Sequence, residues 1–306
     1  MEPSLHAHET ARPAEAAQGA LPAVEPASFA EPWRERDIAD RLEAEGLVFL
    51  PETAFRLTPD EQRFLTPAIC DGRSKNVSYD PVTGCVSGTS LRGAEAAGLA
   101  ALMSRYAFWA EALVADLAPR YLGALQRGRT SLRPRSVDEA PLSSRRDDRR
   151  LHADAFPSQP TGGRRLLRVF SNISPDGLAR VWQIGEPFET YARRWLPHAH
   201  PLWPGEAWLL QQLKITKARR TPYDAMMLAL HDAAKLDEGY QRAGPRREIV
   251  FPARSSWIVF TDSVVHAAIT GRHALEQTFY LPVDAMVDPS RSPLRTLESL
   301  TGQRLC

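Results

Sequence analysis

The stretch Leu166-Leu-Arg-Val-Phe-Ser-Asn-Ile173 decides the fold class of this 306-residue chain. It is rich in branched and aromatic residues, and it predicts a β-strand. Further β-rich segments follow, each bounded by Pro, Gly, Ser or Asp, at residues 179–184, 248–251, 257–261 and 275–281. One helix, at about residues 223–240, interrupts them. Because regular helices do not alternate with the strands, the pattern favours a sandwich or jelly roll over a parallel α/β sheet.

The first half of the chain differs from the β-rich second half, because it predicts a disordered lead followed mainly by helices. Residues 1–31 are rich in Ala, Pro and Glu, and we expect a disordered lead there. We expect residues 32–306 to form one mainly β domain with flanking helices, in which residues 32–126 give helical support. Ile38 and Leu42 predict a helix that Gly46 ends, and a short strand follows at 47–50. Further helices are expected to start at Thr58 and to span about 93–125.

The amino-acid composition limits the kinds of partner that the protein can bind and the cellular compartment that suits it. Lys+Arg 38 against Asp+Glu 37 gives no overall attraction for nucleic acid, and 43% hydrophobic residues suffice for a core. Three cysteines without a C-x-x-C motif indicate neither a disulfide framework nor a zinc ribbon, and a reducing compartment fits. We see no signal peptide and no membrane span, so we expect a soluble cytoplasmic protein.

Arginine dominates the cations, since only four of the 38 are lysines. Eight arginines lie within residues 127–150, just before His152: Arg127, Arg129, Arg133, Arg135, Arg145, Arg146, Arg149 and Arg150. Such a run usually forms a solvated loop. The alternative is an anion-binding lip that leads to His152.

His152-Ala-Asp154, followed far downstream by His266, is the candidate site. Alternate side chains of an extended chain share a face, so His152 and Asp154 can point the same way, and we expect His266 at the end of the strand that begins at Trp257. Two imidazoles and one carboxylate form the facial triad of non-haem Fe(II) oxygenases, which leaves positions open for a co-substrate and O₂. Asp262 could orient a ligand or cap a turn.

Other readings of these histidines stay open. The His-x-Asp pair could be a surface pair, and His266 could be a core histidine bonded to a carbonyl. The second closely spaced pair, His198 and His200, lies between prolines, and we interpret it as loop.

Three longer stretches resemble the Fe(II)/2-oxoglutarate dioxygenases, specifically the bacterial Kdo hydroxylases. They are Leu151-His-Ala-Asp-Ala-Phe-Pro-Ser-Gln-Pro160, Arg164-Arg-Leu-Leu-Arg-Val-Phe-Ser-Asn-Ile-Ser-Pro175, and Val250-Phe-Pro-Ala-Arg-Ser-Ser-Trp257 continued to His266-Ala267. The resemblance covers about residues 33–282.

This resemblance implies a jelly-roll (double-stranded β-helix) dioxygenase in which His152, Asp154 and His266 hold Fe(II). With O₂ and 2-oxoglutarate as co-substrates, it would hydroxylate C3 of 3-deoxy-D-manno-oct-2-ulosonic acid (Kdo) in the lipopolysaccharide inner core, on Kdo-lipid A, and release succinate and CO₂. Such an enzyme would contact the inner leaflet of the inner membrane peripherally.

The distal carboxylate of 2-oxoglutarate needs a cation. Many relatives place Arg or Lys about ten residues after the distal histidine, but this chain has Leu275-Glu-Gln277 there. Arg168 and Arg272 are the two replacements, and we favour Arg168.

For the carboxylated sugar and the lipid A phosphates, the candidates are Arg133, Arg180, Trp182 and Asn172. Two alternatives remain at this point. One is a 2-oxoglutarate dioxygenase for a protein side chain or a small metabolite, and the other is a non-catalytic jelly-roll module that binds a metal or ligand.

Overall fold

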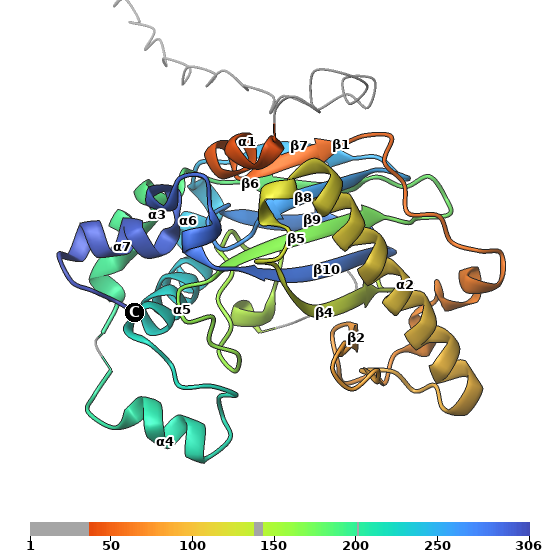
Figure 1. Ribbon diagram of the computed structural model, residues 1–306, viewed down its shortest axis with the longest axis horizontal. Helices are drawn as coiled ribbons and strands as arrows, with labels where there is room; N and C mark the ends of the chain where they lie inside the picture. Colours follow the sequence, from red (N-terminus) through yellow and green to blue (C-terminus); the bar gives the residue numbers. More distant parts are fainter. Residues whose placement is uncertain (1–36, 138–142, 201) are drawn as a thin grey trace, which may run out of the picture.

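Two antiparallel sheets form the centre of the protein in a computed structural model (Figure 1). The structure describes residues 37–137, 143–200 and 202–306, so the expected lead at 1–31 lies outside the described residues. The larger sheet has seven strands in the order β1-β8-β5-β10-β4-β2-β3, and the smaller has three in the order β7-β6-β9. Both sheets pair neighbours far apart in sequence, which is typical of a sandwich rather than of a meander.

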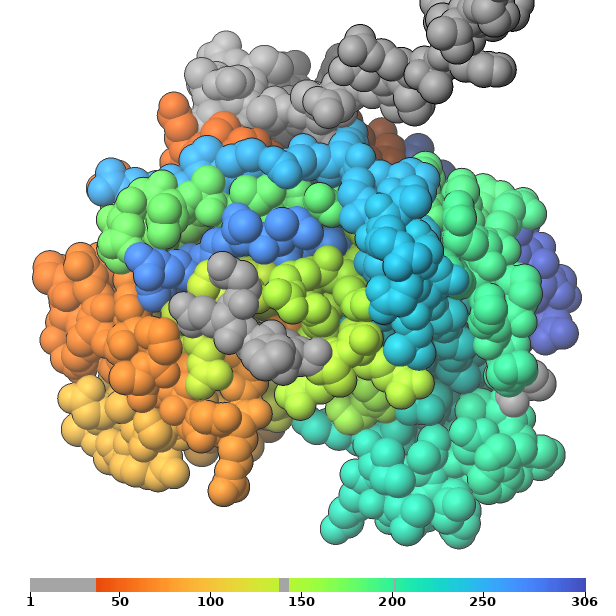
Figure 2. Space-filling view, turned by 180° about the vertical axis from the view of Figure 1, so that it is seen from behind, coloured from red at the N-terminus to blue at the C-terminus, as the bar shows by residue number. Residues whose placement is uncertain are grey.

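The strands of the larger sheet are β1 (Leu47–Leu50), β2 (Val77–Tyr79), β3 (Val86–Ser87), β4 (Gln126–Arg133), β5 (Arg165–Asn172), β8 (Ser256–Phe260) and β10 (Ala274–Leu281). Those of the smaller sheet are β6 (Arg180–Ile184), β7 (Arg247–Phe251) and β9 (His266–Thr270). Every predicted strand is therefore present. Figure 2 shows the smaller sheet from outside, with β7, β6 and β9 one below another.

Helices flank the sheets. The α-helices of the described residues are α1 (Ile38–Glu45), α2 (Gly93–Leu117), α3 (Phe188–Trp195), α4 (Glu206–Gln212), α5 (Pro222–Leu236), α6 (Glu238–Ala243) and α7 (Pro293–Thr301). The long helix α2 crosses the larger sheet and contacts β4 and β10, whereas α3, α5, α6 and α7 gather at one end (Figure 1). No helix in the described ranges is long and apolar enough to cross a bilayer.

Strand register fixes which side chains face the smaller sheet. Across the larger sheet, Ser78 pairs with Ser131, Ser131 with Glu276, and Glu276 with Phe170. Side chains two residues apart share a face, so this polar row extends to Arg129, Arg133, Arg168, Thr278 and Tyr280. The opposite face carries buried apolar residues, among them Leu132, Val169 and Leu275. The larger sheet thus has one apolar face and one polar, charged face.

Several predicted boundaries need correction. The helix expected at 93–125 ends at Leu117, because Pro119 and a short 3₁₀ turn follow. The start expected at Thr58 yields only a 3₁₀ helix, Asp60–Phe64. The helix expected at 223–240 is two helices, since Asp237 accepts a hydrogen bond from the backbone N–H of Tyr240 and begins α6.

The arginine-rich run is not one solvated loop. Its first part is strand β4, in which the buried Gly128, Thr130 and Leu132 alternate with residues of the arginine-bearing face. Arg127 forms an ion pair with Glu111 of α2, whereas Arg129 and Arg133 line a cavity between the sheets. Because Leu132 is the one large apolar residue among the buried positions of β4, their alternation carries little hydrophobic signal.

Candidate active site

His152 and His266 are tied to each other through the backbone. The N–H of His152 donates to the carbonyl of His266 at 3.0 Å, and the N–H of His266 donates to the carbonyl of His152 at 2.8 Å. His266 begins β9 of the smaller sheet and does not end β8 as predicted, since a turn at Thr261–Val265 separates the two strands. The N–H of Asp154 donates to the carbonyl of Thr261 at 2.8 Å, which fixes the third residue beside the first two.

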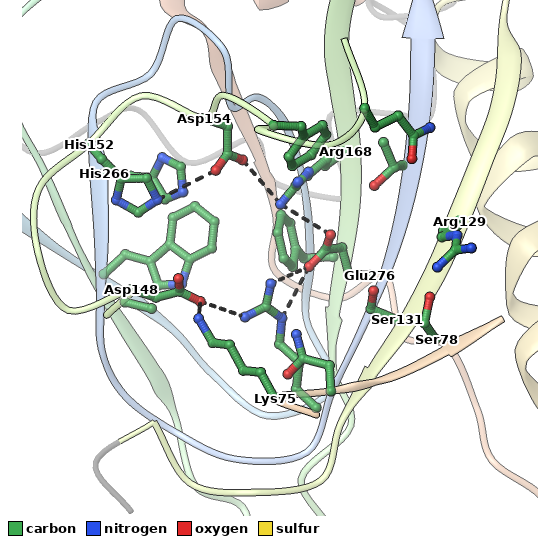
Figure 3. Close-up of a pocket in the computed structure, with 18 of the residues that line it drawn as sticks. Lys75, Ser78, Arg129, Ser131, Asp148, His152, Asp154, Arg168, His266 and Glu276 are labelled. Carbon is green, nitrogen blue, oxygen red and sulfur yellow. Dashed lines mark hydrogen bonds and ion pairs between the residues drawn. The ribbon is translucent and has the colours of Figure 1, made fainter. Parts of the chain in front are cut away.

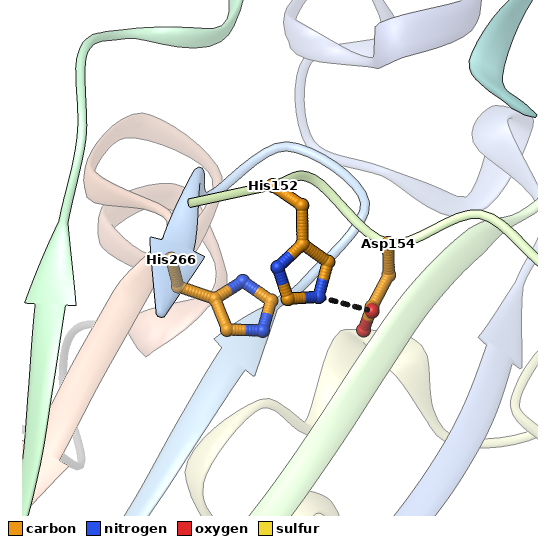
Figure 4. A group of neighbouring side chains, drawn as sticks. All are labelled: His152, Asp154 and His266. Atoms are coloured by element: carbon orange, nitrogen blue, oxygen red, sulfur yellow. Dashed lines mark ion pairs between the residues drawn. The ribbon is translucent and has the colours of Figure 1, made fainter. Parts of the chain in front are cut away.

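Backbone carbonyls also set the orientation of both imidazoles. Nδ1 of His152 lies 2.7 Å from the carbonyl oxygen of Arg150, and Nδ1 of His266 lies 2.8 Å from that of Val264. A carbonyl oxygen can only accept, so each Nδ1 carries the proton and each Nε2 keeps its lone pair. The potential ligand atoms of His152, Asp154 and His266 all lie within 4.8 Å of one another (Figure 4).

Burial keeps these groups in the charge states that bind a cation. Burial, with Lys235 next in effect, lowers the pKa of His152 to about 3, and burial also lowers the pKa of His266. Burial alone would raise the pKa of Asp154, but the Arg168 guanidinium and the two imidazoles hold it well below its ordinary value. The site therefore presents two neutral imidazoles and one carboxylate at neutral pH.

Aromatic rings hold the histidines laterally. Trp182 of β6 stacks on His266, with centroids 4.9 Å apart and planes 20° apart. His231 of α5 meets His152 edge to face at 5.3 Å. Trp182 is 2% exposed and also packs against Phe170, so its ring already has neighbours in the core.

The three residues open into a cavity of about 330 Å³ between the sheets. The polar face of the larger sheet supplies one wall and the smaller sheet the other, through Arg180, Trp182 and Ala268. Figure 3 shows the histidines and Asp154 at one end of this triad pocket and Arg129, Ser131 and Ser78 at the other. The triad pocket can therefore hold a small elongated molecule, with one end at the candidate metal ligands and the other end among polar side chains.

A chain of ion pairs crosses the triad pocket. Arg168 Nη1 lies 3.1 Å from Asp154 Oδ2 and 3.1 Å from Glu276 Oε1. On the other side of Glu276, Arg133 pairs with that carboxylate and with Asp148, at 3.0 Å from Asp148 Oδ2. Lys75 completes the chain by pairing with Asp148 (Figure 3).

Arg180 differs from these cations. It is 1% exposed, and its Nε and Nη1 have no hydrogen-bond partner among the described residues. Burial, with Arg133 next in effect, lowers the pKa of Arg180 to about 9. The guanidinium is thus a buried cation that faces the triad pocket without a direct counterion.

The structure brings most of the predicted site residues together, but not all. Arg168, Arg133, Arg180 and Trp182 line the triad pocket with the three candidate ligands. Arg272 does not: it pairs with Asp176, and its side chain is 40% exposed.

Two other residues have structural partners instead of a place in the triad pocket. The side-chain amide of Asn172 donates to the carbonyls of Leu178 and Phe251 at 2.9 and 3.0 Å, and this residue borders a different cavity. Asp262 accepts from Arg165 Nε at 2.8 Å, so it neither orients a candidate ligand nor lies in the triad pocket.

Sequence reasoning missed the carboxylates that organise the triad pocket. Glu276 stands at the position where an arginine or lysine was sought, and its charge is the signal that could have suggested a partner for Arg168. Asp148 and Lys75 carry no comparable signal, because they are 73 residues apart and meet only through the fold.

The donor set fits a ferrous ion. Two Nε2 lone pairs and a carboxylate are the donors of a facial triad. Asp154 Oδ2 is buried and accepts no hydrogen bond from the described residues, so its lone pairs can bind a metal while the carboxylate keeps its ion pair with Arg168. Carbonyl groups behind both imidazoles are the supporting partners that metal-bound histidines usually have.

Comparisons with known proteins agree with this geometry. The family model described as 3-deoxy-D-manno-oct-2-ulosonic acid (Kdo) hydroxylase matches residues 27–304. A search of curated proteins finds no match.

Solved structures of the Kdo hydroxylase KdoO, a non-haem Fe(II) and α-ketoglutarate-dependent dioxygenase, are similar to this chain. The apo structure is 43% identical, with a TM-score of 0.86, and the match covers 90% of this chain and 93% of that one. The complex with cobalt(II) is 42% identical with a TM-score of 0.84, and the complex with α-ketoglutarate and Fe(III) is 41% identical with a TM-score of 0.83. Both matches cover 93% of this chain and 97% of the other.

The expected jelly-roll dioxygenase fold is thereby confirmed. The family match spans most of the chain, and the identities hold over nearly its full length. This chain belongs to the Kdo hydroxylase family of enzymes.

Proposed function

We propose that this protein is an Fe(II)- and 2-oxoglutarate-dependent dioxygenase that hydroxylates C3 of Kdo in the lipopolysaccharide inner core, as part of Kdo-lipid A. The observation that carries the proposal is the buried group of His152, Asp154 and His266, whose free donor atoms converge at one end of the triad pocket. The geometry suits a metal with an open side, and the family supplies the substrate class.

His152, Asp154 and His266 would hold the ferrous ion. When bound, the iron with 2-oxoglutarate and O₂ supplies the oxidising power to hydroxylate a C–H bond, with succinate and CO₂ as co-products. The chain holds the ligand atoms in place through backbone hydrogen bonds and the ring of Trp182. Phe156 and Phe170 add apolar surface that limits water near the reacting carbon.

Arg168 is our candidate for the distal carboxylate of 2-oxoglutarate. It is 7% exposed, lines the triad pocket, and lies beside Asp154, so a chelator of the metal would reach it. Its Nε has no hydrogen-bond partner among the described residues and remains available to an incoming carboxylate. Glu276 shares the guanidinium and holds it in position.

Arg180 and Arg133 are our candidates for the carboxylate of Kdo. Glu276 and Asp148 already neutralise the charge of Arg133. Arg180, in contrast, has two nitrogen atoms, Nε and Nη1, without a hydrogen-bond partner among the described residues. Trp182 borders the same part of the triad pocket, where its ring positions His266.

The acceptor determines where the enzyme works. Kdo-lipid A is anchored in the inner membrane, so we propose that this protein contacts the inner leaflet peripherally from the cytoplasm. We also propose that residues 32–306 act as one domain with an N-terminal lead at 1–31.

The test is anaerobic addition of Fe(II) and then 2-oxoglutarate to the metal-free protein. A visible charge-transfer band should appear in the wild type and be absent from Asp154→Ala. With O₂ and a Kdo acceptor, mass spectrometry should then find one added oxygen atom. A wild-type protein that gives no band and consumes no 2-oxoglutarate would contradict the proposal.

A further inference from the structure

A second cavity adjoins the triad pocket. It has a volume of about 230 Å³, and Lys75, Asn76, Arg133, Asp148 and Arg180 line both hollows. On the face seen in Figure 2, the orange segment that contains residues 72–76 adjoins the yellow-green segment that contains residues 143–148. The ion pairs of Asp148 with Lys75 and Arg133 therefore lie between two neighbouring cavities.

The lining of this second hollow, which we call the basic cavity, is strongly cationic. Its six basic side chains are Arg73, Lys75, Arg133, Arg135, Arg146 and Arg180, and its two carboxylates are Asp147 and Asp148. Asp147 forms an ion pair with Arg149, and Asp148 forms ion pairs with Lys75 and Arg133. Arg73, Arg135, Arg146 and Arg180 form no ion pair with another described residue, so the described lining of the cavity carries an excess of positive charge.

Burial distinguishes this cluster from an ordinary solvated face. Arg73 and Arg146 are exposed at the rim, Arg135 is half-buried, and Arg180 is 1% exposed. Bulk water compensates the charge of the side chains at the rim, whereas Arg180 is almost entirely removed from the surface and its Nε and Nη1 have no hydrogen-bond partner among the described residues. A buried cation without a counterion is unfavourable, and an anion that enters beside it relieves that penalty.

We propose that the basic cavity binds a second anionic group of the acceptor, a carboxylate or a phosphate, while the sugar acid to be hydroxylated occupies the triad pocket. This inference rests on the proposed function and specifies its substrate: an acceptor with at least two acidic groups about one sugar apart. Arg180 borders both spaces and contributes to binding at their junction. Arg73, Arg135 and Arg146 serve only the second group.

The experiment measures hydroxylation kinetics with three acceptors. They are free Kdo, a Kdo disaccharide with a second carboxylate and no phosphate, and Kdo linked to a phosphorylated glucosamine with a phosphate and no second carboxylate. The test variant is the Arg73→Gln/Arg135→Gln double substitution. Arg120→Gln, an exposed arginine outside both cavities, is the matched control.

The double variant should raise the KM of one or both larger acceptors about tenfold, which corresponds to the loss of a charge-assisted contact, and should raise the KM of free Kdo far less. If the KM rises more for the Kdo disaccharide, the bound group is a carboxylate; if it rises more for the phosphorylated acceptor, the bound group is a phosphate. Equal changes for all three acceptors, or no change, would overturn the inference.

Two controls separate this outcome from other failures. If the double variant melts well below the wild type, the exposed rim variant Arg146→Gln takes its place and should show the same selectivity at smaller size. If wild-type protein hydroxylates neither these three acceptors nor Kdo-lipid A itself, the proposed function fails. An active wild type with unselective variants refutes only the second anion site.

Discussion

Arg168 and Arg180 are both buried and border the same pocket from facing sheets, but their surroundings are opposite. Arg168 lies between the carboxylates of Asp154 and Glu276. Arg180 has no ion-pair partner in the described part of the chain, and two of its nitrogens lack hydrogen bonds. The comparison shows that the role of a buried cation depends on whether carboxylates of the protein already neutralise it. A compensated cation such as Arg168 stabilises the fold even before any ligand binds, whereas an uncompensated cation such as Arg180 depends on a ligand for its counter-charge.

The largest loss of activity is expected at Asp154, because this residue belongs both to the metal site and to the ion pair with Arg168. Asp154→Ala removes a candidate iron ligand and one partner of Arg168, so activity should fall below detection while the fold persists. His152→Ala and His266→Ala should do the same. Turnover of 2-oxoglutarate is the measurement, circular dichroism checks the fold, and Asp176→Ala, at the surface pair with Arg272, is the control. Wild-type turnover in any of the three variants would remove that residue from the metal site.

Loss of the compensated cation should damage both stability and co-substrate binding. Arg168→Met leaves Asp154 and Glu276 without their shared partner, and we expect unfolding free energy to drop by about 3 kcal/mol. The KM for 2-oxoglutarate should rise more than tenfold, since a charged carboxylate contact is lost.

Denaturant unfolding and 2-oxoglutarate titration measure these two effects. Arg272→Met, which breaks an exposed pair, should cost less than about 1 kcal/mol and leave the KM unchanged. If Arg272→Met instead raises the KM for 2-oxoglutarate, the assignment of Arg168 is wrong.

Loss of the uncompensated cation should have the opposite effect on stability. Arg180→Met replaces a lone buried charge with an apolar side chain of similar length, so the unfolding free energy should stay constant or rise by about 1 kcal/mol. The KM for the Kdo acceptor should rise about tenfold while the KM for 2-oxoglutarate stays constant. A loss of stability like that of Arg168→Met would erase the distinction between the two arginines.

The smallest effect concerns the backbone behind Arg180. Gly271 has φ +111°, and a Cβ there would lie 2.8 Å from Arg180 Cα. Gly271→Ala should therefore displace Arg180 slightly, cost about 1 to 2 kcal/mol, and raise the acceptor KM a few fold. Gly302→Ala is the control, because its φ is also positive but no atom lies within 4 Å of the added Cβ. Equal acceptor kinetics in both variants would show that the position of Arg180 is insensitive to Gly271.

The strands were predictable where apolar periodicity is strong and unpredictable where it is weak. β5 and β10 each contain several branched or aromatic residues, such as Leu, Phe and, in β5, Val, and their predicted positions agree with the structure to within a residue or two. β4 was not predicted because Gly128 and Thr130 occupy two of its three buried positions and give no apolar periodicity, although it pairs with β10 just as β5 does. The placement of His266 at the start of β9 likewise depends on the partner strand β6 and on its bridge to His152.

The candidate metal ligands were predictable because their chemistry requires particular residue types at a short spacing. The wider site was not, because its charge balance is a property of the fold. Arg133, Arg168, Arg180 and Arg272 are alike in sequence, and only the structure separates two paired pocket residues, one unpaired pocket residue and one surface residue.

The reciprocal backbone bridge between His152 and His266 has a consequence for how the enzyme acquires its metal. Both ligands are positioned by main-chain hydrogen bonds, so the conformational entropy of assembling the site is lost when the protein folds and not when iron arrives. The frame is preorganised, unlike that of domains that fold only around their metal. Iron should therefore exchange reversibly in the native protein, and its removal by a chelator should leave a template ready for reloading.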